Sequence, residues 1–169
     1  MSLSIHAASV SVFQQMLGSL KDILAKAEAH AAAKKIEPQA LLGARLAPDM
    51  FPLTRQVQIA CDFAKGVCGR LAQAELPVHE DNEQSFAELQ ARIDKVLAFI
   101  GALPATAFDG AERREIVIRP GTPKERRFSG QDYLLQYGLP QFFFHHTTSY
   151  ALLRHNGVEI GKVDYMGTF

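Results

Sequence analysis

Three long stretches of this chain repeat apolar residues every three or four positions, a spacing that indicates amphipathic helices and leaves few alternatives to a bundle. The first stretch predicts a helix from about Ser4 to Ala33. Its stripe consists of Val10, Phe13, Leu17, Leu20, Leu24, Ala27 and Ala31. Each stripe must be buried against another element, so the pattern predicts helices that pack on one another.

The second and third stripes predict helices that end before Pro77 and Pro104. Their apolar positions are Leu53, Val57, Ala60, Ala64, Val67 and Leu71, then Phe86, Leu89, Ile93, Val96, Leu97 and Ile100. Asp49 is the expected N-cap of the second helix, and Asp81 with Gln84 forms the expected capping box of the third. Three helices with one stripe each require a fourth to close the core.

Before that fourth helix, the apolar period changes from 3.6 to 2, which predicts a β-hairpin at about 114–129. Ile116–Ile118 precede the turn Pro120–Pro123, and Phe128 follows it. Residues 112–127 hold six basic residues against three glutamates, a local excess of three positive charges. We expect a solvated hairpin with cross-strand ion pairs, and an anion or partner site is the alternative.

The expected fourth helix extends from Pro140 to Gly157, because proline in the first turn and glycine just past the end are typical helix limits. Apolar residues surround most of it, so it should be the most buried of the four. The tail 158–169 is apolar enough to pack on the bundle or on a second copy. Residues 1–169 are therefore predicted to form a single domain.

Charge and hydropathy exclude several classes of partner. Eighteen basic residues balance eighteen acidic ones, so neither a nucleic acid nor a membrane surface is an expected partner. No stretch approaches 18 apolar residues and no signal peptide is visible, which favours a cytoplasmic protein. Cys61 and Cys68 lie about 10 Å apart along one helix, too far for a disulfide, and are expected to be reduced core residues.

Helix geometry limits which histidines can share a ligand. His145 and His146 are adjacent and project about 100° apart, and His155 lies about 15 Å further along the axis. Ser149 stands where a His-x-x-x-His metal pair would need its second imidazole. His145 is on the least apolar side of its helix, where it either faces water or lines a polar pocket. Gln56 flanks the stripe of the second helix, within reach of such a pocket.

Two separated stretches carry a family resemblance: Arg45–Leu53 with Gln56–Gln58 and Ala60, and Phe142–Gly157 with Val158, Gly161, Lys162 and Asp164. Together they resemble a bacterial family of unknown function within the DinB/YfiT-like superfamily. The resemblance implies an all-α, up-down-down-up four-helix bundle with the small β-hairpin inserted before the last helix. It also implies a homodimer.

Where the superfamily has an activity, the resemblance implies a divalent metal, such as zinc or nickel, held by three histidines. One comes from the second helix and two from a His-x-x-x-His pair on the last. This chain has no histidine on its second helix and only half of the pair. His145 is therefore the single metal-ligand candidate.

Two functions follow as hypotheses. The first is a DinB-like protein without the three-histidine site that binds a small molecule near His145 and Tyr150. For it, the resemblance marks Gln56, His145, Tyr150, Arg154 and His155, together with Asp62, which the helical wheel places at the surface. The second is a metal-dependent thiol transferase or hydrolase with non-standard ligands around His145. No catalytic residue is assigned, because the chain lacks a nucleophile elbow, a phosphate loop, a dinucleotide fingerprint and an H-E-x-x-H motif.

Overall fold

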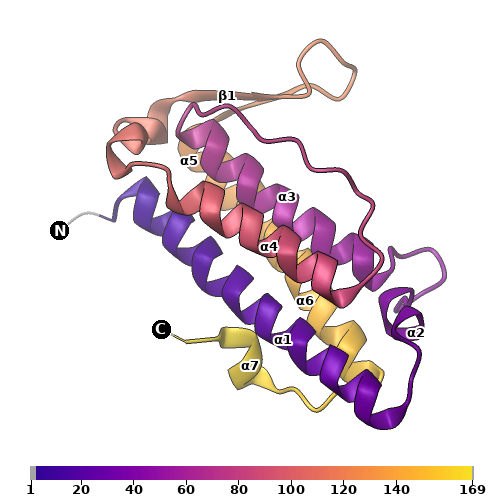
Figure 1. The fold of residues 1–169 in the computed structure, drawn as a ribbon. Coiled ribbons are helices and arrows are strands. Elements are labelled where there is room, and N and C mark those ends of the chain that lie inside the picture. The colour runs from indigo at the N-terminus through magenta and orange to yellow at the C-terminus, as the bar shows by residue number, and fades with distance from the viewer. Residues whose placement is uncertain (1–2, 169) are drawn as a thin grey trace.

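The computed structural model describes residues 3–168 and shows four long helices in an up-down-down-up bundle (Figure 1). These helices are α1 (Val12–Lys34), α3 (Leu53–Leu71), α4 (Phe86–Gly101) and α6 (Leu139–His155). Helices α1 and α6 run in one direction and α3 and α4 in the other (Figure 1). The crossover 72–85 returns along the length of the bundle, which is why the consecutive helices α3 and α4 are parallel. The predicted fold class is confirmed.

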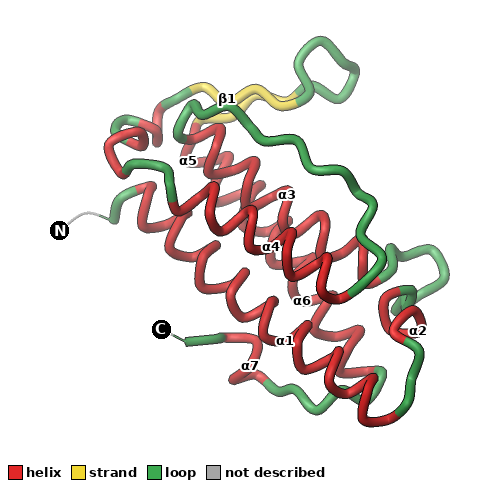
Figure 2. Tube along the Cα trace, viewed as in Figure 1, coloured by secondary structure: helices red, strands yellow, loops and turns green. Residues whose placement is uncertain are grey.

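Shorter elements connect the bundle (Figure 2). They are the π-helical turn η1 (Ala7–Ser11), α2 (Pro38–Leu42), the 3-10 turns η2 (Ala105–Phe108) and η3 (Ala111–Arg113), β1 (Glu115–Ile118), β2 (Arg126–Ser129), α5 (Gly130–Asp132), the π-helical segment η4 (Tyr133–Gly138) and α7 (Lys162–Met166). The two strands form the predicted antiparallel hairpin, with Val117 opposite Arg127. The expected cross-strand ion pair is present between Arg127 and Glu115, at 3.3 Å.

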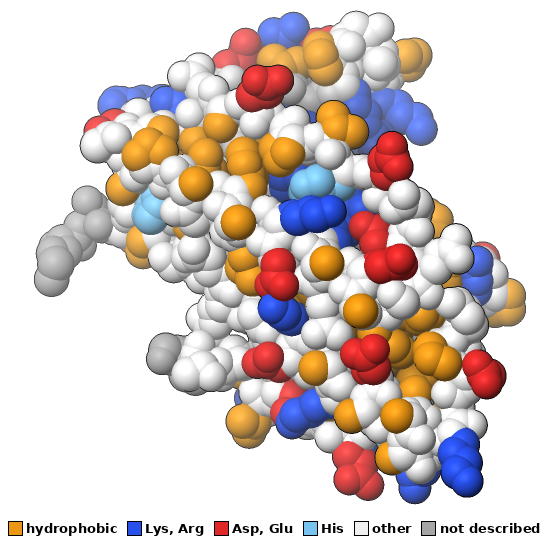
Figure 3. Space-filling model, in the orientation of Figure 1, with side chains coloured by type: hydrophobic (Ala, Val, Ile, Leu, Met, Phe, Trp, Pro, Cys, Tyr) orange, Lys and Arg blue, Asp and Glu red, His pale blue; other side chains and the backbone are white. Residues whose placement is uncertain are grey.

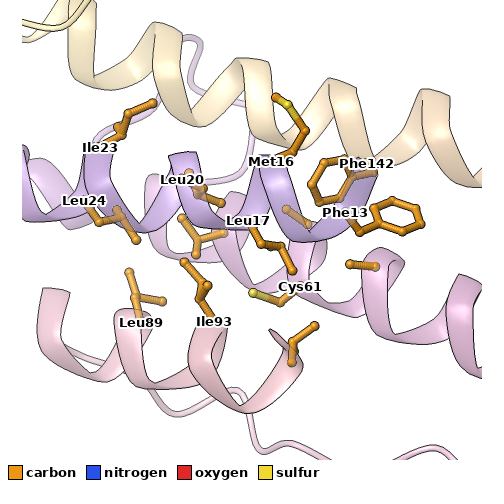
Figure 4. Packing of buried hydrophobic residues seen from close by; sticks show 14 of the residues in the cluster. Phe13, Met16, Leu17, Leu20, Ile23, Leu24, Cys61, Leu89, Ile93 and Phe142 are labelled. Carbon is orange, nitrogen blue, oxygen red and sulfur yellow. The ribbon is translucent and has the colours of Figure 1, made fainter. Parts of the chain in front are cut away.

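The core lies between the four long helices (Figure 4). Helix α3 packs on α4 and α6, and α1 packs on the other side of the same two helices. The rings of Phe13 on α1 and Phe142 on α6 meet edge to face with centroids 4.9 Å apart. Cys61 and Cys68 are buried free thiols, as predicted. Burial raises the pKa of each thiol to about 12, so both remain protonated near neutral pH.

Helix α6 begins at Leu139, one residue before the predicted start at Pro140, but helical backbone that was not predicted precedes it. Helical backbone continues from Gly130 through η4 into α6, and Ser129 caps its start by accepting a hydrogen bond from the Asp132 backbone N–H at 3.1 Å. Proline lacks the N–H that an α-helix interior needs. The π-helical segment directly before α6 shifts the hydrogen-bond register at this point, so the helix continues past the proline.

Both predicted N-caps are also wrong. Helix α3 follows Pro52 with no side-chain cap, and Asp49 is exposed in the preceding turn. Helix α4 begins after Ser85, whose hydroxyl accepts from the Glu88 N–H at 3.2 Å, while the Glu88 carboxylate accepts from the Gln84 N–H at 2.6 Å. The Asp81 carboxylate instead pairs with the guanidinium of Arg92 at 3.0 Å, because a carboxylate binds an arginine more strongly than it binds a backbone amide.

The apolar tail packs on its own bundle, against α1 (Figure 1). Gln15 Nε2 donates to the Met166 carbonyl at 2.9 Å, and Lys26 pairs with Asp164 at 2.5 Å. Phe169, the last residue of the predicted tail, lies outside the described residues. Among residues 3–168, no helix has both the length and the apolarity needed to cross a membrane.

Candidate ligand-binding site

His145 is buried between α6 and α3 and is held by Gln56. Its Nδ1 lies 2.7 Å from Gln56 Oε1, while Gln56 Nε2 donates to the Phe51 carbonyl at 3.1 Å. Because a carbonyl can only accept, the amide oxygen of Gln56 faces the imidazole, and His145 Nδ1 is the protonated nitrogen. The Nε2 lone pair of His145 has no hydrogen-bond partner within residues 3–168. The ring of Phe63 lies nearly parallel to the imidazole, with centroids 6.0 Å apart.

Burial, together with the positive charge of Arg55, lowers the pKa of His145 to about 4. The imidazole is therefore neutral at physiological pH. A neutral ring with one nitrogen fixed as donor presents the other as a hydrogen-bond acceptor or a proton acceptor. This geometry makes His145 an oriented polar group inside an otherwise apolar interface.

His146 points to the opposite side of the same helix. Its Nε2 donates to the Met16 carbonyl at 2.9 Å and lies 3.2 Å from Ser19 Oγ, both on α1. Its Nδ1 is buried without a partner within residues 3–168, and burial lowers the pKa of the ring to about 4. Tyr165 of α7 covers the ring edge to face at 4.6 Å. His146 therefore joins α6 to α1 and α7 and does not share a site with His145.

The structure unites Gln56 and His145 but not the rest of the expected pocket. Tyr150 is half-buried on the other side of α6, against Tyr165 at 5.7 Å. Arg154 and His155 are exposed at the carboxyl end of α6. Spacing along one helix places these side chains on its different faces, so a single pocket cannot collect them.

Asp62 belongs to an ion network around a buried arginine. Arg92 on α4 is only 2% exposed and lies within 3.0 Å of carboxylate oxygens of Asp62, Asp81 and Glu83. Lys65 also pairs with Asp62, at 3.1 Å. Asp62, with 40% of its side chain exposed, lies at the surface as the helical wheel predicts, and it pairs with Arg92 rather than with His145. The network fastens the crossover 72–85 to α3 and α4.

A cavity of about 190 Å³ opens next to Phe63, beneath the hairpin, and we call it the hairpin cavity. It is lined by Asp62, Phe63, Gly66, Arg70, Ile118, Arg119, Tyr133 and Tyr137. The Tyr133 and Tyr137 rings lie nearly parallel at 5.9 Å, and Tyr137 meets Phe63 edge to face at 5.8 Å. Phe63 therefore touches both His145 and the wall of the cavity. The Phe63 ring thus lies between His145 and the aromatic cavity.

Gly66 shapes the position of Arg70 in this cavity. Arg70 Nη1 donates to the Gly66 carbonyl at 3.1 Å and lies 3.2 Å from the Tyr133 hydroxyl. A Cβ at position 66 would come within 2.5 Å of Nη1. A glycine inside a helix lowers helix stability by about 1 kcal/mol relative to alanine. Gly66 therefore makes α3 less stable but leaves room for the guanidinium of Arg70.

The sequence reasoning missed the residues of the hairpin cavity, although two signals mark it. Gly66 interrupts a helix four residues before Arg70, and Tyr133 and Tyr137 share one helical face at a spacing of four. The segment holding both tyrosines was expected to lie before the last helix rather than within it. The hairpin's contribution, Ile118 and Arg119, depends on tertiary packing.

The described residues do not fit the three-histidine metal site that the resemblance implies. Within residues 3–168, no group of three or more His, Cys, Asp or Glu side chains is arranged to hold a metal ion. His145 directs its Nδ1–H at Gln56, whose amide oxygen points at the ring, and His146 bonds to α1. The imidazoles diverge, so the donors do not converge on one point as a metal centre requires.

Comparisons with known proteins agree with this fold. A family model described as a domain of unknown function (DUF1993) matches residues 5–166. The chain is also similar to the crystal structure of a DinB family member protein from Shewanella denitrificans, with a TM-score of 0.92 and 40% sequence identity. That similarity covers 98% of this chain and 93% of the other. No curated protein matches the chain.

Proposed function

The chain belongs to the DUF1993 family, a DinB-like family of unknown function, and from that premise we propose that it binds a small organic molecule in the hairpin cavity. The observation that carries this proposal is the cavity itself. It is a partly open cavity bordered by α3, β1 and η4 and lined by three aromatic rings. Binding sites for small molecules combine an apolar, aromatic wall with a few convergent polar groups, and this cavity has both.

The size of the cavity sets the size of its ligand. An engineered protein cavity of roughly 150 Å³ holds a benzene molecule. The hairpin cavity, at about 190 Å³, has room for one six-membered ring with a small substituent. Gln56 and His145 support this site indirectly, because the imidazole held by Gln56 stacks on the ring of Phe63, which lines the cavity.

Nuclear magnetic resonance of the ¹⁵N-labelled protein tests the proposal, with benzyl alcohol and benzoate as probes. We expect amide shifts to change at Gly66, Arg70, Tyr133 and Tyr137. Tyr137→Ala should abolish these changes, because it removes one wall of the cavity. Tyr150→Ala is the matched control, since Tyr150 lies on the other side of α6. Shifts confined to the surroundings of Tyr150, or the absence of any shift, would overturn the proposal.

We also propose that two copies of the chain associate through α6. Leu46, Met50, Phe143, Phe144, Thr147, Thr148 and Ala151 line an open groove that contains no charged side chain. Leu46 is 42% exposed and Phe144 56% exposed, an unusual cost for large apolar residues. An uncharged face is best covered by another uncharged face, and the same groove of a second copy, related by a twofold axis, supplies one.

A further inference from the structure

We propose that the ligand of the hairpin cavity is an aromatic carboxylate, with its ring against Tyr137 and its carboxylate on Arg70 and Arg119. This inference rests on the proposed function, because it names the chemical class of the molecule bound there. Three observations support it: positive charge without a counter-ion at the cavity, an edge of the Arg70 guanidinium that donates no hydrogen bond within residues 3–168, and the aromatic rings of the cavity wall.

The first observation is the charge balance of the cavity. Its only acidic residue, Asp62, is already paired with Arg92 and Lys65. Within residues 3–168, neither Arg70 nor Arg119 has a carboxylate within 4 Å. Two positive charges are therefore left without a counter-ion at the cavity, which favours an anion there.

The charge excess continues into an adjoining cavity of about 470 Å³, which shares Ile118, Arg119 and Tyr137 with the first. Lys124 and Arg126 line it and form no ion pair with a described residue. Its one acidic residue, Glu125, is held by Arg127 at 3.0 Å and by the Gly121 N–H at 2.7 Å. Lys and Arg side chains are prominent at this end of the molecule, over the hairpin (Figure 3). The route into the hairpin cavity therefore attracts negative charge.

The second observation is the orientation of Arg70. Its Nη1 is fixed by the Gly66 carbonyl and the Tyr133 hydroxyl. Its Nε and Nη2 donate no hydrogen bond to any residue within 3–168, and neither atom is fully buried. These two N–H groups form the side edge of the guanidinium, which matches the two oxygens of a carboxylate. The protein therefore holds the Arg70 guanidinium through Nη1 and leaves its Nε and Nη2 edge free to bind a carboxylate.

The third observation is the aromatic slot. The rings of Phe63, Tyr133 and Tyr137 line the cavity, with the Tyr137 centroid 5.9 Å from that of Tyr133 and 5.8 Å from that of Phe63, so a planar ligand beside the guanidinium contacts an aromatic wall. Arg119 completes the site from the hairpin, at a backbone φ of 52°, which residues other than glycine rarely adopt. The volume of the hairpin cavity matches one ring with a short acidic substituent.

Isothermal titration calorimetry with probes of one shape and different charge tests the inference. Benzoate, benzamide and benzylamine share a ring, while acetate carries the carboxylate without it. We expect benzoate to bind at least about tenfold more tightly than benzamide, since a hydrogen bond between charged groups contributes that much or more. Acetate and benzylamine should bind more weakly than either.

Three variants test whether Arg70 and Arg119 cause the preference for benzoate over benzamide. Arg119→Gln is on the exposed hairpin and should fold normally, and Gly66→Ala displaces the Arg70 guanidinium while improving helix propensity. Both should lower benzoate affinity about tenfold and leave benzamide affinity within about twofold. Arg113→Gln, at an 87% exposed side chain outside the cavity, is the matched control and should bind like the wild type.

The outcomes separate the two proposals. Equal binding of benzoate and benzamide in the hairpin cavity would overturn the aromatic carboxylate and leave small-molecule binding intact. Tight benzoate binding that is unchanged in both Arg119→Gln and Gly66→Ala would also overturn it. Failure of every ring-bearing probe to bind would overturn the proposed function and this inference together.

Discussion

His145 and Gln56 are 89 residues apart in the sequence, yet the imidazole Nδ1 donates to the amide oxygen across 2.7 Å of buried interface. The bond joins α6 to α3, the helix that contributes Phe63 and Arg70 to the wall of the hairpin cavity. It fixes the tautomer of a neutral ring in a position where the superfamily resemblance implies a metal ligand. His146, its neighbour, bonds to α1 instead, so the pair of histidines joins three helices.

The two buried histidines should make the protein sensitive to acid. Burial holds both folded-state pKa values at about 4, whereas an unfolded histidine titrates near pH 6.5. The unfolded state binds more protons between these values, so stability is full above about pH 6.5 and is lost as the pH falls toward about 4. Urea unfolding of the wild type and His146→Gln should show this. The stability gap between them should be larger at pH 8 than at pH 5, and a constant gap would contradict the explanation.

Arg92→Met should destabilise the protein by about 3–5 kcal/mol, because removing one partner of a buried ion network leaves the others uncompensated. The Arg92 side chain is 2% exposed and forms ion pairs with the carboxylates of Asp62, Asp81 and Glu83. Arg127→Met is the matched control: its side chain is 60% exposed and solvent screens its ion pairs, so its loss of stability should be clearly smaller than that of Arg92→Met. Urea unfolding at pH 7 measures both, and equal losses would show that the Arg92 network is not what fastens the crossover.

Two glycines should respond in opposite directions to alanine. Gly18 lies inside α1 with nothing within 4 Å of an added Cβ, so Gly18→Ala should stabilise the protein by up to about 1 kcal/mol. At Gly130 an added Cβ would lie 1.8 Å from the Ala111 carbonyl oxygen, a backbone atom that cannot turn aside. Gly130→Ala should therefore cost about 2 kcal/mol or more. Thermal unfolding distinguishes the two, and a tolerated Gly130→Ala would refute the close approach of α5 to η3.

Phe144→Glu should prevent association of two copies. It places a charge in the uncharged groove of α6, where burial against a second copy leaves that charge unpaired. Light scattering after gel filtration should give twice the chain mass for the wild type and the chain mass for the variant. Leu135→Glu changes an apolar side chain of similar exposure outside the groove and should leave the mass unchanged. A monomeric wild type at high concentration would disprove the dimer.

Protein purified without added ions should contain less than stoichiometric zinc or nickel. The described donors around His145 diverge, so a divalent ion lacks the ligands it needs. Elemental analysis of the wild type, His145→Ala and His155→Ala measures this. Stoichiometric metal that disappears only in His145→Ala would revive the metal-dependent enzyme.

The sequence alone determined the fold. The apolar stripes of α1, α3 and α4 and the change of period at the hairpin are local patterns in the sequence. Each stripe marks the one face of its helix that must be buried in the core. The family resemblance is equally local, since it rests on two continuous stretches of residues. The ends of the helices are harder to predict. Ser85 caps α4 in place of Asp81, because Asp81 pairs with the distant Arg92, and helical backbone extends from the cap at Ser129 to Pro140 through the π-helical segment η4.

Only the tertiary structure decided the site. Periodicity placed Gln56 and His145 near a common pocket, but it could not separate them from Tyr150, Arg154 and His155, which share the helix and not its faces. The hairpin cavity gathers α3, β1 and η4 from positions up to 75 residues apart, between Asp62 and Tyr137. The sequence shows how residues are spaced along one helix and therefore which of them share a face. Which residue lies opposite them across a cavity depends on how the helices pack.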